Sequence, residues 1–142
     1  MLLGEYDHTL DDKNRLTLPA KLREELGDEV VITRGLDGCL SVYSKAAFAV
    51  LAERVGTLDP FRPETRTMQR YFFTSAPPVE LDKQGRMVIP AKLLAGAGIE
   101  REVTVAGVFD HLEIWDRATW REQLTQAEGS AEDVAERLAN RD

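Results

Sequence analysis

The sequence predicts an α+β fold in which two tandem ββαββ-type units build one pseudo-symmetric, interleaved β-barrel with peripheral helices. Two observations predict this. The segment LDDKNRLTLPAKL, which begins at residue 10, recurs as LDKQGRMVIPAKL from residue 81, with seven of thirteen positions identical. The likeness continues, since EVVITRG and LSVYSKAAF face EVTVAGV and LEIWDRATW in the second half. Similarity of this length and order indicates an internal duplication.

The first elements of each copy are predicted to be two strands joined by a tight turn. EYDHTLD and PPVELD enter the turn, and RLTL and RMVI, which alternate as strands do, return from it. Asn14 and Gly85 occupy the turns. Both residue types tolerate a left-handed backbone, so we expect them to shape the turn.

A short helix and two further strands follow in each copy. Pro19 and Pro90 suit the first turn of the helices AKLREEL and AKLLAGA, and Gly27 and Gly98 suit their exits. The expected strands cover residues 29–33, 40–43, 102–106 and 112–115. Four short strands and one short helix cannot bury their own apolar face. The second copy is therefore expected to complete the core of the first.

The remaining segments are predicted to be helical. Helices should begin near Ser44 and Asp116, which are both suitable N-caps, and residues 64–73 read as another helix. After Gly129, a capping-box pattern that starts at Ser130 predicts a separate short terminal helix. The predicted division is a first unit at 5–48, a connecting helical segment at 49–75, a second unit at 76–120 and a helical tail at 121–142.

Composition and charge describe a soluble globular protein with an uneven charge distribution. The chain is 43% hydrophobic and 30% charged, and it shows no apolar run long enough to span a bilayer. Cys39 is the single cysteine, which suits a reducing cytoplasm. The net charge of −7 argues against nucleic acid as a binding partner. However, much of this negative charge is at one end, because residues 110–142 alone hold nine acids against four bases. The repeated segments are locally basic, with two acids against four bases in 10–23 and one against three in 81–92.

Each predicted turn carries an Asp four residues before an Arg, in the pairs Asp11–Arg15 and Asp82–Arg86. An arginine beside a tight turn projects from a rigid tip, and its planar fork can donate two bonds to guanine. The Asp across the turn can hold the guanidinium in place and so reduce the entropy lost on binding. The structural alternative is an ion pair that only closes the hairpin.

These residues resemble the MraZ family of bacterial transcriptional regulators, which are built from two SpoVT-AbrB-type units. The resemblance rests on both D-x-x-x-R motifs with the following LPAKL or IPAKL, and on MLLGEY, QRYFFTSA and LEIWD. It implies a swapped-hairpin barrel, ring assembly, and binding to short direct repeats in the promoter of the division and cell wall gene cluster. It also implies that Arg15 and Arg86 contact DNA, with Asp11 and Asp82 as their motif partners.

Several other residues are candidates for contact with DNA. Lysines suited to phosphate contact are Lys13, Lys21, Lys83 and Lys92, although for any single one of them a solvated surface lysine is the better explanation. Asn14 and Gly85 form the turns, and Gly85 would let a phosphate approach closely.

A stripe of arginines lies on the predicted helix between the two copies. Arg62, Arg66 and Arg70 recur every four residues and share one face. This stripe has three possible roles. It could form a subunit interface that also includes Phe72, it could be a solvated helix face, or it could contact DNA.

Enzyme chemistry finds little support. His8 and His111 are isolated from any C-x-x-C or H-x-x-x-H companion, so no zinc site is predicted. A metal-dependent nuclease centre built from Asp11, Asp12 and Asp82 conflicts with their basic neighbours and turn context. The sequence therefore predicts neither an enzyme nor a bound cofactor or metal.

The predicted function is sequence-specific regulation of transcription, with repression as the expected sign. One tip with few phosphate contacts binds weakly, and this weakness favours a homo-oligomeric ring that engages several direct repeats of double-stranded DNA at once. We expect a cytoplasmic, nucleoid-associated protein without a membrane partner. The alternative is a ring-forming adaptor or antitoxin-like module that holds another protein and does not read DNA.

Overall fold

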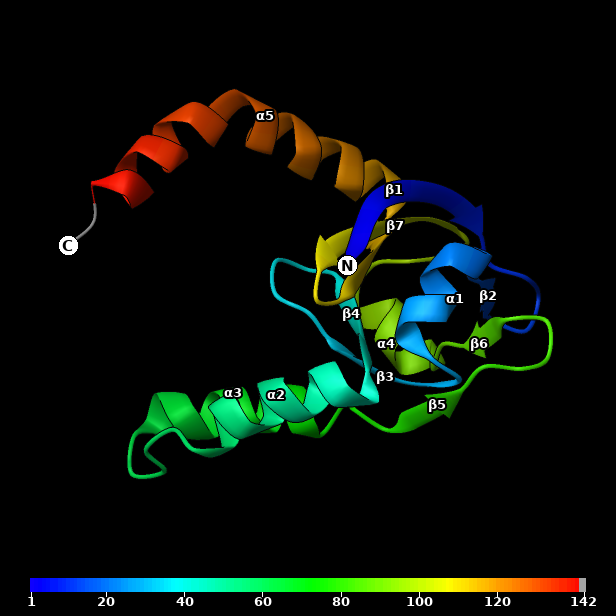
Figure 1. Ribbon diagram of the computed structural model, residues 1–142, viewed down its shortest axis with the longest axis horizontal. Helices are drawn as coiled ribbons and strands as arrows, with labels where there is room; N and C mark the ends of the chain where they lie inside the picture. The colour runs from blue at the N-terminus through cyan, green and yellow to red at the C-terminus, as the bar shows by residue number, and fades with distance from the viewer. Residues whose placement is uncertain (141–142) are drawn as a thin grey trace.

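The computed structural model describes residues 1–140 (Figure 1). Along the chain the elements are β1 (Leu2–Thr9), β2 (Arg15–Thr17), α1 (Ala20–Leu26), β3 (Glu29–Arg34), β4 (Leu40–Ser44), α2 (Lys45–Gly56), α3 (Pro63–Phe73), β5 (Pro78–Glu80), β6 (Arg86–Val88), α4 (Ala91–Gly96), β7 (Glu102–Phe109), β8 (Leu112–Asp116) and α5 (Arg117–Ala139). Both copies show the predicted order of elements, and the fold is α+β.

The strands of the two copies are interleaved. Within residues 1–140 they form a six-stranded antiparallel sheet in the order β1-β7-β8-β4-β3-β5 and a two-stranded sheet of β2 and β6. Strand β1 pairs along its whole length with β7 of the second copy, and β5 pairs with β3 of the first. Each copy therefore gives its first strand to the other copy, so neither half completes its sheet alone.

One hydrophobic core contains side chains of both copies. Leu16 and Met87, which face each other across the β2–β6 pair, are fully buried, as are Val42 and Ile114 of the larger sheet. The short helices α1 and α4 add Leu22 and Leu93 to the same cluster. It also contains Leu10, Leu18, Ile89 and Val105. This core fixes the two-stranded sheet to the six-stranded one.

Local signals place the helix ends close to their predicted positions. Helices α1 and α4 begin one residue after Pro19 and Pro90, and Gly27 ends α1 at a φ of 83° with its N–H donating to the Arg23 carbonyl. Ser44 caps α2 by accepting a hydrogen bond from the Ala47 N–H at 3.1 Å.

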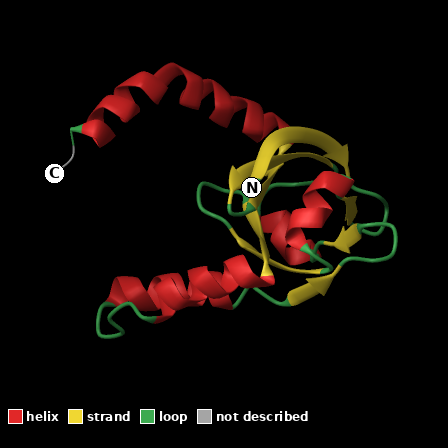
Figure 2. Ribbon diagram, in the orientation of Figure 1, coloured by secondary structure: helices red, strands yellow, loops and turns green. Residues whose placement is uncertain are grey.

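Two helical projections leave the body of the protein. Helices α2 and α3 lie side by side, and this pair and α5 extend in the same general direction away from the strands (Figure 2). We call the α2–α3 pair, residues 45–73, the arm. No residue of α5 is buried.

The prediction of a separate terminal helix after Gly129 is wrong. Helix α5 runs without interruption from Arg117, whose N-cap Asp116 accepts from the Thr119 N–H at 3.1 Å, to Ala139. Glycine in a helix interior costs about 1 kcal/mol but does not end the helix. The Ser130 hydroxyl, which the capping box required, instead donates to the Gln126 carbonyl one turn earlier, at 2.7 Å.

Candidate nucleic-acid interface

The two D-x-x-x-R turns have nearly the same hydrogen-bond geometry. Asp11 Oδ1 accepts from the backbone N–H groups of Lys13 and Arg15 at 2.9 Å, and its Oδ2 accepts from Arg15 Nε at 2.6 Å. Asp82 accepts in the same way from Gln84 N–H, Arg86 N–H and Arg86 Nε, at 2.9, 2.9 and 2.7 Å. We call these turns, residues 11–15 and 82–86, the two tips.

The tip backbone needs residues that accept a positive φ. Asn14 has a φ of 58° and Gly85 a φ of 76°, as the sequence predicts. The N–H groups of both residues donate back to the Asp carbonyls, at 3.1 and 2.9 Å, which closes each turn. The Asn14 and Gly85 carbonyls accept from the N–H groups of Ile89 and Leu18 of the opposite copy, so each tip is also hydrogen-bonded to the residue that follows the short strand of the other copy.

The β2–β6 pair carries both arginines on its outer face. In its register Arg15 lies opposite Val88 and Arg86 lies opposite Thr17, while Leu16 and Met87 between them point into the core. Arg15 and Arg86 are therefore diagonal neighbours on one face, with backbones about 7–8 Å apart. Thr17 and Val88, which complete this face, are exposed.

Each guanidinium is held through only one of its nitrogens. Both Asp carboxylates engage Nε, and no group within residues 1–140 accepts from the Nη atoms of Arg15 or Arg86. Both arginine side chains are 27% exposed. Four N–H donors on each fork thus remain available for a ligand.

The carboxylates remain charged over the whole neutral and mildly acidic range. Burial raises the pKa of Asp11, but hydrogen bonds from the backbone and side chain of Arg15 outweigh it and lower the pKa to about 2. The Arg86 N–H is the main cause that lowers the pKa of Asp82. The charge-assisted bonds that orient both arginines therefore persist at physiological pH.

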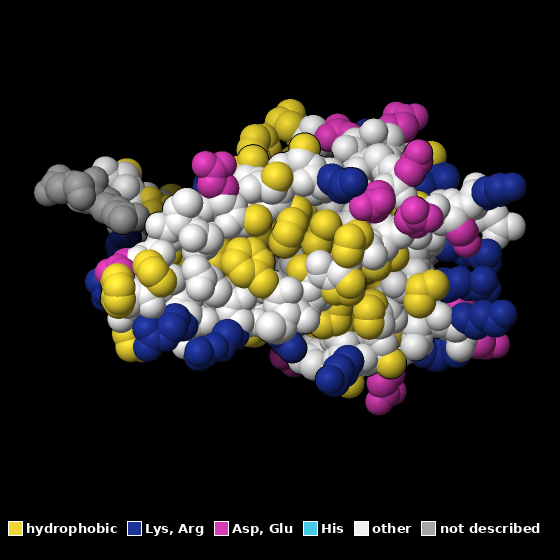
Figure 3. Space-filling view, turned by 90° about the horizontal axis from the view of Figure 1, so that it is seen from below, with side chains coloured by type: hydrophobic (Ala, Val, Ile, Leu, Met, Phe, Trp, Pro, Cys, Tyr) yellow, Lys and Arg dark blue, Asp and Glu magenta, His cyan; other side chains and the backbone are white. Residues whose placement is uncertain are grey.

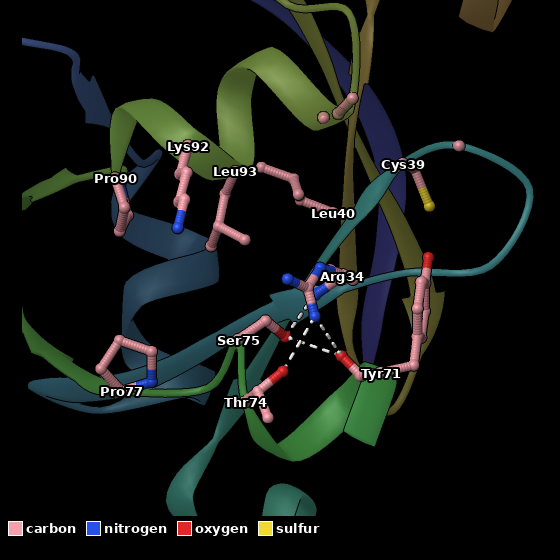
Figure 4. Close-up of a pocket in the computed structure, with 13 residues that line it drawn as sticks. Arg34, Cys39, Leu40, Tyr71, Thr74, Ser75, Pro77, Pro90, Lys92 and Leu93 are labelled. Atoms are coloured by element: carbon pink, nitrogen blue, oxygen red, sulfur yellow. Dashed lines mark hydrogen bonds between the residues drawn. The ribbon is translucent and has the colours of Figure 1, made fainter. Parts of the chain in front are cut away.

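The predicted lysines fall into two groups. Lys13 and Lys83 are exposed within the tips, and Lys21 is exposed on α1. Figure 3 shows Lys and Arg gathered at the end of the molecule where the tips lie. Lys92 on α4 is exposed as well, but it also lines a cavity between α4 and the base of the arm (Figure 4).

Arg23 is a residue of the tip region that motif reading missed. A Cβ built on Gly85 would lie 2.3 Å from Nη1 of Arg23, so this side chain lies directly against the second tip. Its Nε is buried without a hydrogen-bond partner in the described chain. The only signal in the sequence was the excess of bases in residues 10–23, because no spacing rule links Arg23 to Gly85.

The arginine stripe lies apart from the tips, on α3 at the other end of the molecule (Figure 1). Arg62 forms an ion pair with Glu64 at 3.2 Å, and Arg66 donates to the Pro60 carbonyl at 2.9 Å. Phe72 is 7% exposed and packs within the protomer, whereas Phe61 at the end of the arm is 89% exposed.

The described residues offer no group of three or more His, Cys, Asp and Glu side chains placed to hold a metal ion. His111 lies beside Asp110, stacked on Tyr43, and the β1 residue His8 uses its carbonyl to accept from Arg117. None of the helices described in residues 1–140 combines the length and apolar character that a membrane crossing needs.

A family model described as "MraZ protein, putative antitoxin-like" matches the chain twice, over residues 1–71 and 72–142. The chain belongs to the MraZ family. The two matches are offset by 71 residues, which is the offset between the D-x-x-x-R tips, since Asp82 follows Asp11 by the same number. The repeat seen in the sequence is thus the repeat of the MraZ family.

Two curated relatives support the assignment over the full length. Proteins named transcriptional regulator MraZ, from Heliobacterium modesticaldum and Moorella thermoacetica, are 44% and 42% identical to this chain over 142 residues. In both cases the match covers 100% of this chain and 99% of the relative. Membership of the MraZ family places the chain among regulators of transcription and not among enzymes.

Proposed function

We propose that this MraZ-family chain binds DNA through its two tips and reads base edges in the major groove with Arg15 and Arg86. The observation that carries the proposal is the outer face of the β2–β6 pair, where both forks lie side by side with their Nη atoms free. The major groove admits a two-stranded β-ribbon, and arginine is the side chain best suited to guanine O6 and N7.

The Asp partners make these arginines rigid before DNA arrives. Holding Nε fixes the side chain, so less conformational entropy is lost when the Nη atoms bind a base. Around this base-reading face, Lys13, Lys83 and Lys21 supply point charges for phosphates, which fix position but carry no sequence information. Asn14 and Gly85 shape the tip backbone through their positive φ angles. Gly85 itself is buried against the Arg23 side chain, so the close approach of a phosphate that the sequence suggests for Gly85 is blocked there.

The same proposal extends to the fold around the tips. The six-stranded and two-stranded sheets share one core and exchange strands between copies, which supports a swapped-hairpin β-barrel of the SpoVT-AbrB type. Its units are residues 5–48 and 76–120, joined by the connecting segment 49–75 and followed by the tail 121–142.

We propose that protomers associate head to tail into a homo-oligomeric ring. Large apolar side chains are exposed on two different parts of the surface. The arm exposes Val50, Leu58, Phe61 and Phe73, and the β1–β7 side exposes Met1, Leu3, Val108 and Phe109. Figure 3 shows apolar side chains gathered on one broad face of the molecule. Contact between two unlike surfaces is heterologous, and a closed arrangement of such contacts is a ring.

A ring explains how an acidic protein with small DNA-binding tips acts specifically. Each protomer presents one pair of arginines, and short direct repeats about 10 bp apart present the same groove face to successive protomers. Several weak contacts then combine through effective concentration. The proposed target is the promoter of the division and cell wall gene cluster, the sign is repression by occupancy, and the location is the nucleoid in the cytoplasm.

A second candidate function has one observation in its favour. Helix α5 has no buried residue and extends from the body, and such a surface suits an adaptor or antitoxin-like module that holds another protein. An adaptor of this kind would not need the free Nη atoms of Arg15 and Arg86 for its function.

The proposal is tested by the fluorescence anisotropy of labelled duplexes at about 0.15 M salt. Duplexes of equal length would carry three, two or one of the promoter repeats, or a scrambled sequence. We expect the three-repeat duplex to bind about 10³-fold or more tightly than the scrambled one. We expect the loss of one repeat to weaken binding more than tenfold. Equal binding of all four duplexes would refute DNA readout, and binding that ignores repeat number would refute the ring.

A further inference from the structure

A cavity of about 740 Å³ lies between α4, the β3–β4 hairpin and the end of α3, away from the tips (Figure 4). It is lined by residues of both copies and of the segment that connects them. Its volume lies within the range of small-molecule sites, about 300–1,000 Å³.

The cavity exists because β3 and β7, which correspond in the two copies, are paired over different lengths by the strands beside them. Strand β1 pairs with β7 from end to end, but β5 pairs with β3 only over Glu29–Val31. Beyond this point the backbone N–H of Arg34 donates to the Ser75 hydroxyl, at 3.0 Å, and not to a strand. The space beside the outer end of β3 is therefore left unfilled.

The second copy differs at the position that corresponds to Arg34. Repeat alignment places Gly107 where the first copy has Arg34. A Cβ at Gly107 would lie 2.5 Å from the backbone nitrogen of Leu3, because β1 passes directly over it. The second copy therefore has no side chain at the position from which Arg34 faces the cavity in the first copy.

Two cations face this cavity. Arg34 uses Nη1 to donate to the Tyr71 carbonyl at 2.8 Å and to Thr74 Oγ1 at 3.0 Å, and its guanidinium lies over the Tyr71 ring. Within residues 1–140 no group accepts from its Nε or Nη2. Lys92 lies across the cavity from Arg34 (Figure 4), at the exposed side of the site.

The walls are mainly apolar and contain no acid. Leu40, Leu93, Pro77 and Ala97 line the space, and Arg34 and Lys92 are the charged side chains among the lining residues. Burial raises the pKa of Cys39, which also lines the cavity, to about 12, so its thiol remains neutral. Glu113 and Asp37 act on Cys39 at one side of the site, but the charged side chains among the lining residues are both positive. In a chain of net charge −7, such a lining favours anions.

We propose that this cavity binds a small organic anion whose carboxylate, sulfonate or phosphate group lies between Arg34 and Lys92. Its apolar body lies against Leu40, Leu93 and Pro77. Arg34 is fixed by Nη1 and presents Nε and Nη2, which is the pair of donors that bidentate recognition of an oxyanion uses. Lys92 adds a point charge from the opposite wall.

The test uses anilinonaphthalenesulfonate as probe, because it joins an anionic group to an aromatic body and fluoresces in an apolar site. The neutral analogue N-phenylnaphthylamine has the same kind of body without the sulfonate. We expect saturable binding of one sulfonate probe per chain, at least about tenfold tighter than the neutral analogue. Equal affinity for both probes would overturn the proposal.

The duplication supplies a matched control. Lys92→Gln removes the cavity cation, and Lys21→Gln removes the lysine at the corresponding position of the first copy, which is exposed on α1 and does not line the cavity. We expect Lys92→Gln to weaken probe binding about tenfold and Lys21→Gln to leave it unchanged, with both proteins melting like the parent. Equal effects of the two variants would overturn the assignment of the site. Probe binding that appears only after the assembled protein is diluted to protomers would also overturn it, because the cavity would then be covered by a second copy.

Discussion

Arg15 and Arg86 divide their nitrogens between two tasks. Nε makes the ion pair that closes the tip, and the two Nη atoms, with four N–H donors, have no acceptor within residues 1–140 and are the groups proposed to recognise DNA. A bidentate ion pair made through both Nη atoms would have occupied the end of the fork and left one N–H on each Nη atom, together with Nε, for a ligand. The structural and functional explanations of the D-x-x-x-R motif are therefore compatible in one side chain.

The Asp11 carboxyl gives a residue-scale prediction. The folded-state pKa of about 2 lies below the ordinary value of 3.8, so the charged carboxylate stabilises the fold fully above pH 3.8. This contribution is lost as the pH falls from 3.8 through about 2. We expect carbon-detected NMR of the Asp11 carboxyl to show a midpoint near 2. A midpoint near 3.8 would show that the carboxylate does not hold the Lys13 and Arg15 N–H groups and the guanidinium in solution.

At the scale of elements, the two tips differ in the residue that takes the positive φ. Asn14 carries a side chain there, whereas Gly85 lies under the Arg23 guanidinium and has no space for one. The first copy has Arg23 one turn into its short helix, and the second has the buried Leu94 at the matching position. The repeat is therefore symmetric in backbone but not in the side chains beside its tips.

Gly85→Ala tests this asymmetry. A Cβ would combine left-handed strain with a clash against Arg23, so we expect a loss of about 1–3 kcal/mol in the free energy of unfolding, measured by urea titration. Asn14→Ala keeps the left-handed strain without that clash and should cost less, about 1–2 kcal/mol. Arg23→Ala introduced together with Gly85→Ala should recover part of the loss. No recovery in the double variant would show that Arg23 does not lie against the tip.

Local signals in the sequence predict most elements, and tertiary contacts account for what they miss. Asn14, Gly85, Ser44 and Asp116 act where their own chemistry places them, so turns and caps are confirmed. Gly129 led to a wrong prediction because glycine often ends a helix, yet within a helix it lowers the stability only modestly.

At the scale of the whole molecule, the duplication fixes the shared core but not the pairing of strands. The sequence predicts a strand at EYDHTLD without indicating its partner, and the structure places β7 of the other copy beside β1. Lys21 and Lys92 illustrate the same limit, since they are identical in the repeat yet one is on an open helix face and the other lines a cavity. The exchange of strands is also what brings β2 and β6, and hence both arginines, together.

The most direct test of the account measures the affinity for the three-repeat duplex divided by that for the scrambled duplex. The double variant Arg15→Ala with Arg86→Ala is compared with a matched double variant, Arg121→Ala with Arg137→Ala, which removes the same charge from α5. We expect the tip variant to lose at least a hundredfold of this ratio, since each bidentate contact supplies about 1–3 kcal/mol of discrimination. The α5 variant should keep the ratio, and both should melt within a few degrees of the parent. A folded tip variant that keeps the ratio, or a tip variant that unfolds because its ion pairs only hold the hairpins together, would contradict the account.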